Sequence, residues 1–284
     1  MTTSSKGWGP DGKRAAVCVT FDNLGEVCEL GLGLWPTDLP LGSHPSVTKE
    51  LPQILDLLDA AGLKTTFFFE GWGAEIYPEA VASVIARGHE QGCHGWKHEP
   101  TGSLPPAEAL DAAGRGIAAL RAQGVDVRGF RPPGGRIGPL DPAALRDLGI
   151  SYCAPAGTAP GTVDGMPYLP WLWTAVDALF YFGPFQPLRK GLGLPDDPPG
   201  HEAFQEAIDR DVERTIEEGG LLIYVMHAFL LTEPERMRTV ERLLQRVAAD
   251  NRLWMAPLSE VAAFVKADPD RFEGSAQVET ASWF

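Results

Sequence analysis

Residues 15–23 read Ala-Ala-Val-Cys-Val-Thr-Phe-Asp-Asn, a short apolar run that ends in two polar side chains. A run of this length, rich in β-branched and aromatic residues, predicts a strand. Similar runs recur along the chain and alternate with segments of helical periodicity, which is typical of βα units rather than of a β-sandwich. The expected strands cover residues 15–21, 64–69, 89–93, 127–130, 150–154, 168–176, 221–226 and 253–256.

The segments between these strands predict helices. Over residues 47–61, Leu51, Ile54, Leu55 and Leu58 fall on one helical face, and Gly62 ends the helix. Further helices are expected over residues 78–87, 105–123, 142–148, 202–218, 234–248 and 258–266. No Gly/Ser linker, charge block or fixed-period repeat divides the chain. We therefore expect a single α/β domain over residues 1–284, with a core at roughly 15–263.

The composition argues against several classes of protein. Of 284 residues, 44% are hydrophobic and 22% are charged, as in a folded globular chain. Lys and Arg number 24 against 38 Asp and Glu, and the net charge of −14 repels phosphate backbones and anionic lipid surfaces. We expect neither a nucleic-acid partner nor a membrane partner. Residues 1–12 lack the apolar core of a signal peptide, which favours a soluble, cytoplasmic protein.

The cysteines are too widely spaced for a Cys-x-x-Cys ligand pair or a dense disulfide framework. We expect buried thiols at Cys18, Cys28, Cys93 and Cys153.

Polar side chains follow five of the expected strands at the point where each strand ends. In parallel α/β barrels the reactive groups gather at this edge, because the loops after the strands form one rim. The residues in these positions are Asp22 and Asn23, His94 and His98, Arg131 and Gly134, Asp177, and His227. Their repeated placement predicts a site at the mouth of a barrel.

The pair His94 and His98 indicates a metal site. Four residues apart on one turn of helix, two imidazoles face the same way and can share Zn²⁺, although two surface histidines have the same spacing. Asn23 offers a carbonyl oxygen as a third ligand, which leaves the carboxylate of Asp22 as a general base toward an activated water. An ordinary Asx turn after a strand is the alternative interpretation of Asp22 and Asn23.

His227 and the segment around Arg131 complete the candidate site. His227 closes an apolar strand, either as a buried core histidine or as the general acid that protonates a leaving nitrogen. Residues 131–136, Arg-Pro-Pro-Gly-Gly-Arg, are stiff at the prolines and open at the glycines, so a backbone N–H can approach an oxyanion. A plain Pro-Gly turn is the alternative for this segment.

Taken together and in this order, these motifs resemble those of the polysaccharide deacetylase family, the NodB-homology or carbohydrate esterase family four enzymes. Residues 20–23, Thr-Phe-Asp-Asn, are similar to the first motif (Thr-Phe-Asp-Asp), and residues 94–98 are similar to the second. Residues 130–135, 176–181 and 225–228 resemble the third, fourth and fifth motifs. The resemblance implies a distorted (β/α)₇, TIM-like barrel, which agrees with the strand count above to within one.

The resemblance also implies residue roles. Asp22 would be the catalytic base and His227 the acid. Arg131 would orient Asp22, Asp177 would tune His227, and the N–H of Gly134 would join the oxyanion hole. The implied cofactor is a divalent metal, with zinc expected, and its ligands would be Asn23, His94 and His98.

Two residues depart from the family pattern. Asn23 stands where the family has a metal-binding Asp, so a neutral amide replaces a charged ligand and we expect weaker metal affinity. Glu26, Glu70 and Glu99 are candidates to compensate for the lost charge. Gly134 replaces a Tyr that helps to wall the substrate groove, which weakens the expectation of a long sugar chain.

A finer likeness points to one branch of the family. Residues 70–75, Glu-Gly-Trp-Gly-Ala-Glu, then residues 77–78 and residues 88–90, resemble the branch of cofactor-independent allantoinases and an atypical intracellular peptidoglycan deacetylase. This branch implies a homo-oligomer.

We therefore expect a hydrolase of non-peptide carbon–nitrogen bonds, in particular a metal-dependent N-deacetylase of an amino-sugar or polysaccharide-type substrate. A cyclic-amide hydrolase of the allantoinase type, with weak or no metal dependence, is one alternative. A non-catalytic carbohydrate-binding barrel is the other.

Two segments and the tail have a less regular pattern. Residues 24–46 and 178–200 are Gly/Pro/Leu-rich and longer than ordinary connections, which predicts either caps over the pocket or a subunit contact. Trp96 and Trp173 are expected to line the pocket. The tail, residues 268–284, either frays or docks through Trp283 and Phe284.

Overall fold

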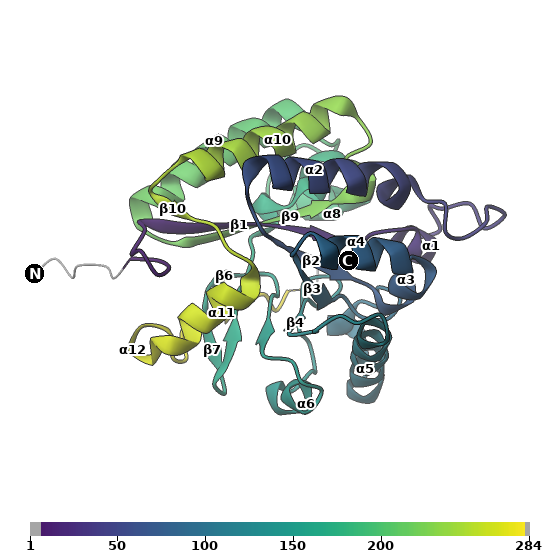
Figure 1. Cartoon of the computed structure of the whole chain (residues 1–284), viewed down its shortest axis with the longest axis horizontal. Coiled ribbons are helices and arrows are strands. Elements are labelled where there is room, and N and C mark those ends of the chain that lie inside the picture. Colours follow the sequence, from purple (N-terminus) through teal and green to yellow (C-terminus); the bar gives the residue numbers. More distant parts are fainter. Residues whose placement is uncertain (1–6, 282–284) are drawn as a thin grey trace, which may run out of the picture.

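The computed structural model describes residues 7–281, and its central feature is a mostly parallel sheet (Figure 1). Successive strands in this sheet pair in parallel, in the order β1 (Ala15–Asp22), β2 (Thr66–Phe69), β3 (Glu90–Cys93), β4 (Gly129–Phe130), β5 (Tyr152–Cys153) and β8 (Met166–Tyr168). On the edge opposite β2, β1 pairs along most of its length with β9 (Leu221–His227). The first residues of β1 pair with β10 (Leu253–Trp254) on the same edge as β2, because Ala16 pairs with both Leu221 and Trp254. Every residue of β1 is buried, as expected for a central strand of an α/β fold.

The sheet returns on itself. An isolated parallel bridge between Val176 and Val225 joins the chain after β8 to β9, which is already paired with β1. The strands therefore form a distorted barrel, as the sequence predicted. Their carboxyl ends share one edge, because the pairing is parallel.

Helices cover the sheet. The predicted helices correspond to α2 (Leu51–Ala61), α4 (Pro78–Ala86), α5 (Pro106–Ala122), α6 (Pro142–Asp147), α9 (Gly200–Glu218), α10 (Pro234–Ala249) and α11 (Leu258–Ala267). A short π-helical turn, η1 (Ser46–Glu50), precedes α2, and Gly62 ends α2 with a φ of 66°, as predicted. In Figure 1, α2, α9 and α10 lie above β1 and β9, whereas α5, α6 and α11 lie below them.

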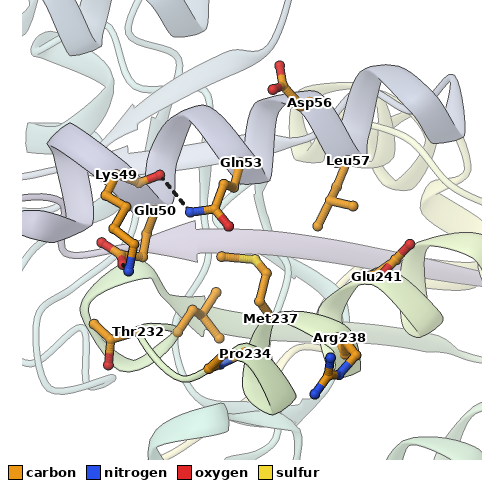
Figure 2. A pocket seen from close by; sticks show the side chains of 11 residues that line it. Lys49, Glu50, Gln53, Asp56, Leu57, Thr232, Pro234, Met237, Arg238 and Glu241 are labelled. Carbon is orange, nitrogen blue, oxygen red and sulfur yellow. Dashed lines mark hydrogen bonds and ion pairs between the residues drawn. The ribbon is translucent and has the colours of Figure 1, made fainter.

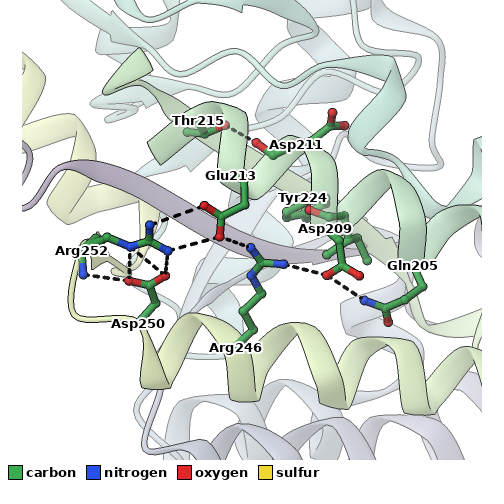
Figure 3. A network of polar contacts seen from close by, with 10 residues as sticks. Gln205, Asp209, Asp211, Glu213, Thr215, Tyr224, Arg246, Asp250 and Arg252 are labelled. Carbon is green, nitrogen blue, oxygen red and sulfur yellow. Dashed lines mark hydrogen bonds and ion pairs between the residues drawn. The ribbon is translucent and has the colours of Figure 1, made fainter. Parts of the chain in front are cut away.

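Ion pairs join α9, α10 and the turn before β10 (Figure 3). The guanidinium of Arg246 contacts Asp209 at 2.7 Å and Glu213 at 2.6 Å, and Arg252 contacts Glu213 at 3.2 Å and Asp250 at 2.6 Å. These groups are partly exposed, so the pairs contribute little to the stability of the fold. The helices are held to the barrel chiefly by buried faces such as that of Leu243, Leu244 and Val247.

The predicted strand over residues 168–176 is wrong for most of its length. Regular pairing ends at Tyr168, and Trp173–Ala175 forms a 3₁₀ turn, η3. Pro170 has no N–H to donate, so the chain continues beside the sheet only through isolated contacts such as the bridge between Ala156 and Trp171.

Several short elements lie outside the sequence predictions. They are α1 (Val27–Gly31), α3 (Gly71–Ile76), η2 (Thr101–Ser103), β6 (Gly157–Ala159), β7 (Gly161–Val163), α7 (Asp177–Tyr181), η4 (Gly183–Phe185), α8 (Gln186–Gly191), η5 (Ala228–Leu230), α12 (Pro269–Phe272) and β11 (Gln277–Val278). Such short elements carry too few residues for a periodic signal. The segment 24–46 therefore contains α1. The segment 178–200 contains most of α7 and all of η4 and α8.

The tail docks on the barrel in the part that the structure describes. β11 pairs antiparallel with β6. Trp283 and Phe284 lie outside the described residues. Cys18, Cys28, Cys93 and Cys153 are free, buried thiols, as predicted. Among residues 7–281, every helix is too short or too polar to cross a lipid bilayer.

Candidate active site

Asp22 and His227 occupy partner positions at the carboxyl ends of the paired strands β1 and β9. Adjacent residues in register on parallel strands present their side chains to the same face of the sheet. Both side chains line one cavity of about 440 Å³, which also receives Asn23, His94 and His98. The structure thus brings together residues from both ends of the chain, as the sequence predicted.

A buried arginine holds Asp22. Nη1 of Arg131 donates to Oδ1 of Asp22 at 2.7 Å and to Oγ1 of Thr20 at 2.7 Å, and the guanidinium lies 4.2 Å from the ring centre of Phe68. Burial raises the pKa of Asp22, and the positive charge of Arg131 opposes the rise. The ion pair fixes one carboxylate oxygen and leaves Oδ2, which lies 3.9 Å from Nε2 of His94.

A second carboxylate holds His227. Oδ1 of Asp177 lies 2.6 Å from Nδ1 of His227, and Oδ2 accepts a hydrogen bond from the His227 backbone N–H at 2.7 Å. Burial lowers the pKa of His227, but the negative charge and hydrogen bond of Asp177 outweigh this effect and leave the pKa raised. With Nδ1 bound to Asp177, Nε2 is the ring nitrogen left to exchange a proton in the cavity.

Asn23, His94 and His98 present neutral donor atoms to the same cavity. Nδ1 of His94 donates to the carbonyl oxygen of Arg131 at 2.8 Å, which leaves the lone pair on Nε2. The rings of His94 and His98 lie 4.9 Å apart, and burial lowers the pKa of each to about 3. Oδ1 of Asn23 is buried, and no group within residues 7–281 forms a hydrogen bond to it.

The two histidines do not share a helical turn, which corrects the sequence prediction. Residues 94–98 form a turn, in which Gly95 has a φ of 74° and His98 a φ of 62°. The backbone N–H groups of Gly71 and Trp72 bind the carbonyl oxygens of Gly95 and Trp96, so contacts with the start of α3 replace helical hydrogen bonds.

Backbone strain also marks this site. Among the described residues, the non-glycine residues with positive φ are Asn23 (54°), His98 (62°) and Asp164 (49°). A positive φ is costly for a side-chain-bearing residue and is often retained where function requires it. Two of these three residues are the predicted metal ligands Asn23 and His98.

The sequence profile of the family described as "Polysaccharide deacetylase" matches residues 10–153, about half of the chain. The chain belongs to the polysaccharide deacetylase family. Its members are carbon–nitrogen hydrolases, so the expected class of enzyme is confirmed.

Relatives with curated functions match over shorter stretches. Chitin deacetylase 1 of Saccharomyces cerevisiae is 33% identical over 96 residues, which make up 34% of this chain and 32% of the yeast protein. Chitin deacetylase 1 of Cryptococcus neoformans is 29% identical over 101 residues, 35% of this chain and 22% of that protein. The matched segment thus spans a third or less of these relatives.

Solved structures match over nearly the whole chain. A candidate polysaccharide deacetylase from Mycobacterium smegmatis is 26% identical, with a TM-score of 0.80 over 96% of this chain and 97% of that one. Puue allantoinase is 17% identical, with a TM-score of 0.69 over 91% and 92% of the two chains. The second likeness concerns the fold alone.

The three glutamates proposed to compensate for Asn23 either accept other hydrogen bonds or are buried with a raised pKa. Glu26 accepts from the hydroxyl of Tyr77 and from the backbone of Gly42, and Glu99 accepts from the backbone N–H groups of Trp96 and Lys97. Glu70 is fully buried, and burial raises its pKa well above the ordinary range. Within residues 7–281, no group of three or more His, Cys, Asp or Glu is placed to hold a metal ion. A metal in this family member would therefore depend on the amide of Asn23.

Gly134 lines the cavity in a turn that only glycine adopts easily. Its φ is 73°, that of Gly135 is 79°, and the N–H of Gly135 closes the turn on the carbonyl oxygen of Pro132 at 3.0 Å. A Cβ on Gly134 would meet Pro100 at 3.6 Å. The Pro-Gly turn and the cavity position are thus both present, and the oxyanion role stays a prediction.

The cavity walls confirm one tryptophan prediction and correct another. Trp173 lines the cavity, whereas Trp96 is absent from its lining and packs under the guanidinium of Arg115, 4.5 Å from the ring centre. The segments 24–46 and 178–200 both contribute lining residues, Leu32 and Phe182 among them, which supports their predicted role as caps.

Phe182, Phe185 and Phe229 also line the cavity, and none of them was among the residues predicted from the sequence. The run Phe-Tyr-Phe-Gly-Pro-Phe at residues 180–185 is a usable signal, because clustered aromatics beside a turn are uncommon in a plain surface loop.

A second pocket, of about 520 Å³, lies between the segment 49–57 and the segment 231–241 (Figure 2). Its described lining includes Lys49, Glu50, Arg238 and Glu241, and no histidine or cysteine. It lacks the acid–base arrangement of the cavity that holds Asp22 and His227.

Proposed function

We propose that this protein hydrolyses the amide bond of an N-acylated substrate, with Asp22 as general base and His227 as general acid. The observation that carries the proposal is their geometry. The two side chains lie in register on neighbouring strands, each has a partner of opposite charge, and both line one cavity.

The reaction follows from these contacts. Asp22 takes a proton from the attacking water through Oδ2, because Oδ1 is bound to Arg131. Oxygen adds to the carbonyl carbon, and the N–H of Gly134 stabilises the developing oxyanion. The carbon–nitrogen bond then breaks as Nε2 of His227 gives its proton to the departing nitrogen. The products are a carboxylic acid and an amine.

The pKa values of Asp22 and His227 are both raised, and each shift suits the role of its group. Asp177 favours the protonated form of His227, which an acid requires. Burial makes Asp22 more basic than an exposed aspartate, and the positive charge of Arg131 opposes this rise in its pKa. Environments that prepare one group to donate and its neighbour to accept are the pattern of an acid–base pair.

We also propose that Asn23, His94 and His98 hold a divalent cation, with zinc as the expected ion. The donor set fits, because both imidazoles are neutral and the Asn23 amide oxygen is buried without a partner among the described residues. When bound, such a cation would supply Lewis-acid polarisation of the water and the carbonyl group. Because all three donors are neutral, they leave the charge of the cation uncompensated, and we expect weak metal binding.

The same neutrality favours a second candidate, the hydrolysis of a cyclic amide with weak or no metal dependence. Chitin deacetylase activity belongs to the curated relatives named above, and an amino-sugar substrate stays a prediction for this chain. Cytoplasmic location and assembly into a homo-oligomer also stay predictions.

The test compares the wild type with Asp22→Asn, which keeps the shape of the side chain and removes the base. Amine release from N-acyl substrates should fall about 10²- to 10⁴-fold in the variant. Loss of wild-type activity on chelation supports the metal-dependent reaction, and its survival favours the second candidate. If the wild type releases amine no faster than Asp22→Asn, the proposed function is wrong.

A further inference from the structure

We infer that the amine part of the substrate is a compact aromatic group, and that the preferred substrates are small N-acyl arylamines rather than sugar polymers. This inference rests on the proposed function, because it uses the position of the acid that protonates the leaving nitrogen. The observation behind it is an unbroken series of aromatic rings that leads from the cavity wall to His227.

Neighbouring rings in this series pack edge to face. Their centres are separated by 4.7 Å (Trp171 and Trp173), 6.0 Å (Trp173 and Phe185), 5.7 Å (Phe185 and Phe182), 5.6 Å (Phe182 and Phe229) and 5.7 Å (Phe229 and His227). All six residues line the cavity. We call the five rings from Trp171 to Phe229 the aromatic wall.

The wall is assembled from separate segments. Trp171 and Trp173 follow β8, Phe182 and Phe185 lie between α7 and α8, and Phe229 lies in η5 directly after β9. The phenylalanines are half-buried, so part of each ring remains open to a ligand. A wall built from packed rings is stiff and can bind another ring with little loss of conformational freedom.

The chemistry of the wall disfavours sugars. Each hydroxyl of a bound sugar needs a hydrogen-bonding partner, because a buried polar group without one is costly. The phenylalanines offer none, and the indole N–H of Trp171 already donates to the carbonyl oxygen of Ala154 at 3.0 Å. The indole N–H of Trp173 is the one further hydrogen-bonding group on these five rings, and a single donor cannot serve the several hydroxyls of a sugar. Lys97 and Glu99 also line the cavity, but they adjoin His98 in sequence and are not part of the wall.

The position of the wall assigns it to the leaving group. His227 gives its proton to the departing nitrogen, so the substituent on that nitrogen lies beside the ring that touches His227. That ring is Phe229, followed by Phe182. The cavity volume of about 440 Å³ falls within the range of about 300–1,000 Å³ that is typical of small-ligand sites.

The first experiment compares two N-acetyl substrates on the zinc-supplemented wild type. One is 4-nitroacetanilide, whose leaving amine carries an aromatic ring, and the other is tetra-N-acetylchitotetraose. We expect kcat/KM for the anilide to be at least about tenfold higher. A preference for the sugar that Asp22→Asn abolishes overturns the inference and leaves the proposed function standing. If neither substrate is hydrolysed faster than by Asp22→Asn, the proposed function fails and the inference fails with it.

The second experiment removes one ring. Phe182→Ser should reduce kcat/KM on 4-nitroacetanilide about tenfold more than on acetamide, which has no substituent on nitrogen. The matched control is Phe264→Ser, because Phe264 is a half-buried ring packed on Trp8 and Trp254 away from the cavity. An equal loss on both amides in Phe182→Ser, or the same selective loss in Phe264→Ser, overturns the inference.

Binding of the free amine gives a readout that does not depend on turnover. Titration with 4-nitroaniline should quench the tryptophan fluorescence of the wild type with saturation, and Phe182→Ser should weaken the binding about tenfold. Glucosamine at equal concentrations should not compete. Competition by glucosamine, or binding of 4-nitroaniline that is unchanged in Phe182→Ser, contradicts the aromatic amine site.

Discussion

Asp22 and His227 lie side by side because β1 and β9 are neighbouring parallel strands that end at the same edge of the barrel. Each side chain is then fixed by a residue from elsewhere in the fold, Asp22 by Arg131 and His227 by Asp177. The two ion pairs give neighbouring groups opposite tendencies toward a proton. This arrangement makes several properties of the protein testable.

Asp177 acts through His227, and Asp177→Asn should shift the pH profile. Asp177 raises the pKa of His227 against the effect of burial, so its neutralisation lowers that pKa. An acid is lost when the pH rises above its pKa, and the alkaline limb of the kcat/KM profile should therefore move to lower pH. A purely structural role for Asp177 predicts the same loss of rate at every pH.

Arg131 should be needed for stability as well as for activity. Its guanidinium is fully buried against Asp22, and removing one partner of a buried ion pair leaves an uncompensated charge, at a cost of about 3–5 kcal/mol. Arg131→Met should lower the free energy of unfolding in urea by about this amount at pH 7. The double variant with Asp22→Asn and Arg131→Met should lose at least about 1 kcal/mol less free energy of unfolding than the sum of the two single losses. Additive losses in the two variants contradict the coupling.

Asn23→Asp should strengthen metal binding. The substitution adds a negative charge to a donor set that is otherwise neutral, beside two imidazoles whose pKa is about 3. We expect at least about tenfold tighter zinc binding in competition with a chromophoric chelator. Asn23→Ala is the control and should bind more weakly than the wild type. Equal affinity in all three proteins places the metal elsewhere.

His89 should make the fold acid-sensitive. Burial lowers its pKa from 6.5 to about 4, and its Nδ1 accepts a hydrogen bond from the N–H of Thr65 at 3.4 Å. Above pH 6.5 the imidazole is neutral in both states. Between pH 6.5 and 4 the unfolded chain binds the proton and the folded chain does not, so stability is lost as the pH falls.

His89→Gln keeps an acceptor and removes this titration. The free energy of unfolding of the wild type should fall between pH 7 and pH 4.5 by about 2 kcal/mol more than that of the variant. Urea unfolding at the two pH values measures the difference. Parallel losses in the two proteins exclude His89 as the cause.

The sequence predicted the frame of the molecule well. β1 and β9 are long apolar runs, and α2 has a single apolar face and a glycine at its end, so local pattern was enough to place them. The grouping of Asp22, His94 and His227 then followed from the parallel arrangement, since all three sit at strand ends.

Features set by distant contacts were not predictable in this way. The turn at residues 94–98 depends on hydrogen bonds from Gly71 and Trp72, which the spacing of His94 and His98 does not encode. Phe182 and Phe229 belong to separate segments, and only their meeting beside His227 makes them a wall. The same holds for Glu70, whose burial could not be foreseen from its own sequence neighbours.

The central claim is that Asp22 and His227 act on one reaction in one cavity, and a double-mutant cycle on amide hydrolysis tests it most directly. The rates of four proteins are compared: the wild type, Asp22→Asn, His227→Ala and the double variant. Thermal melting verifies that each of them is folded. The account predicts a loss of at least about 10²-fold in each single variant, and a double variant little slower than the worse of the two, because groups that act together are not additive. A single variant that hydrolyses the amide at the full wild-type rate would contradict the claim.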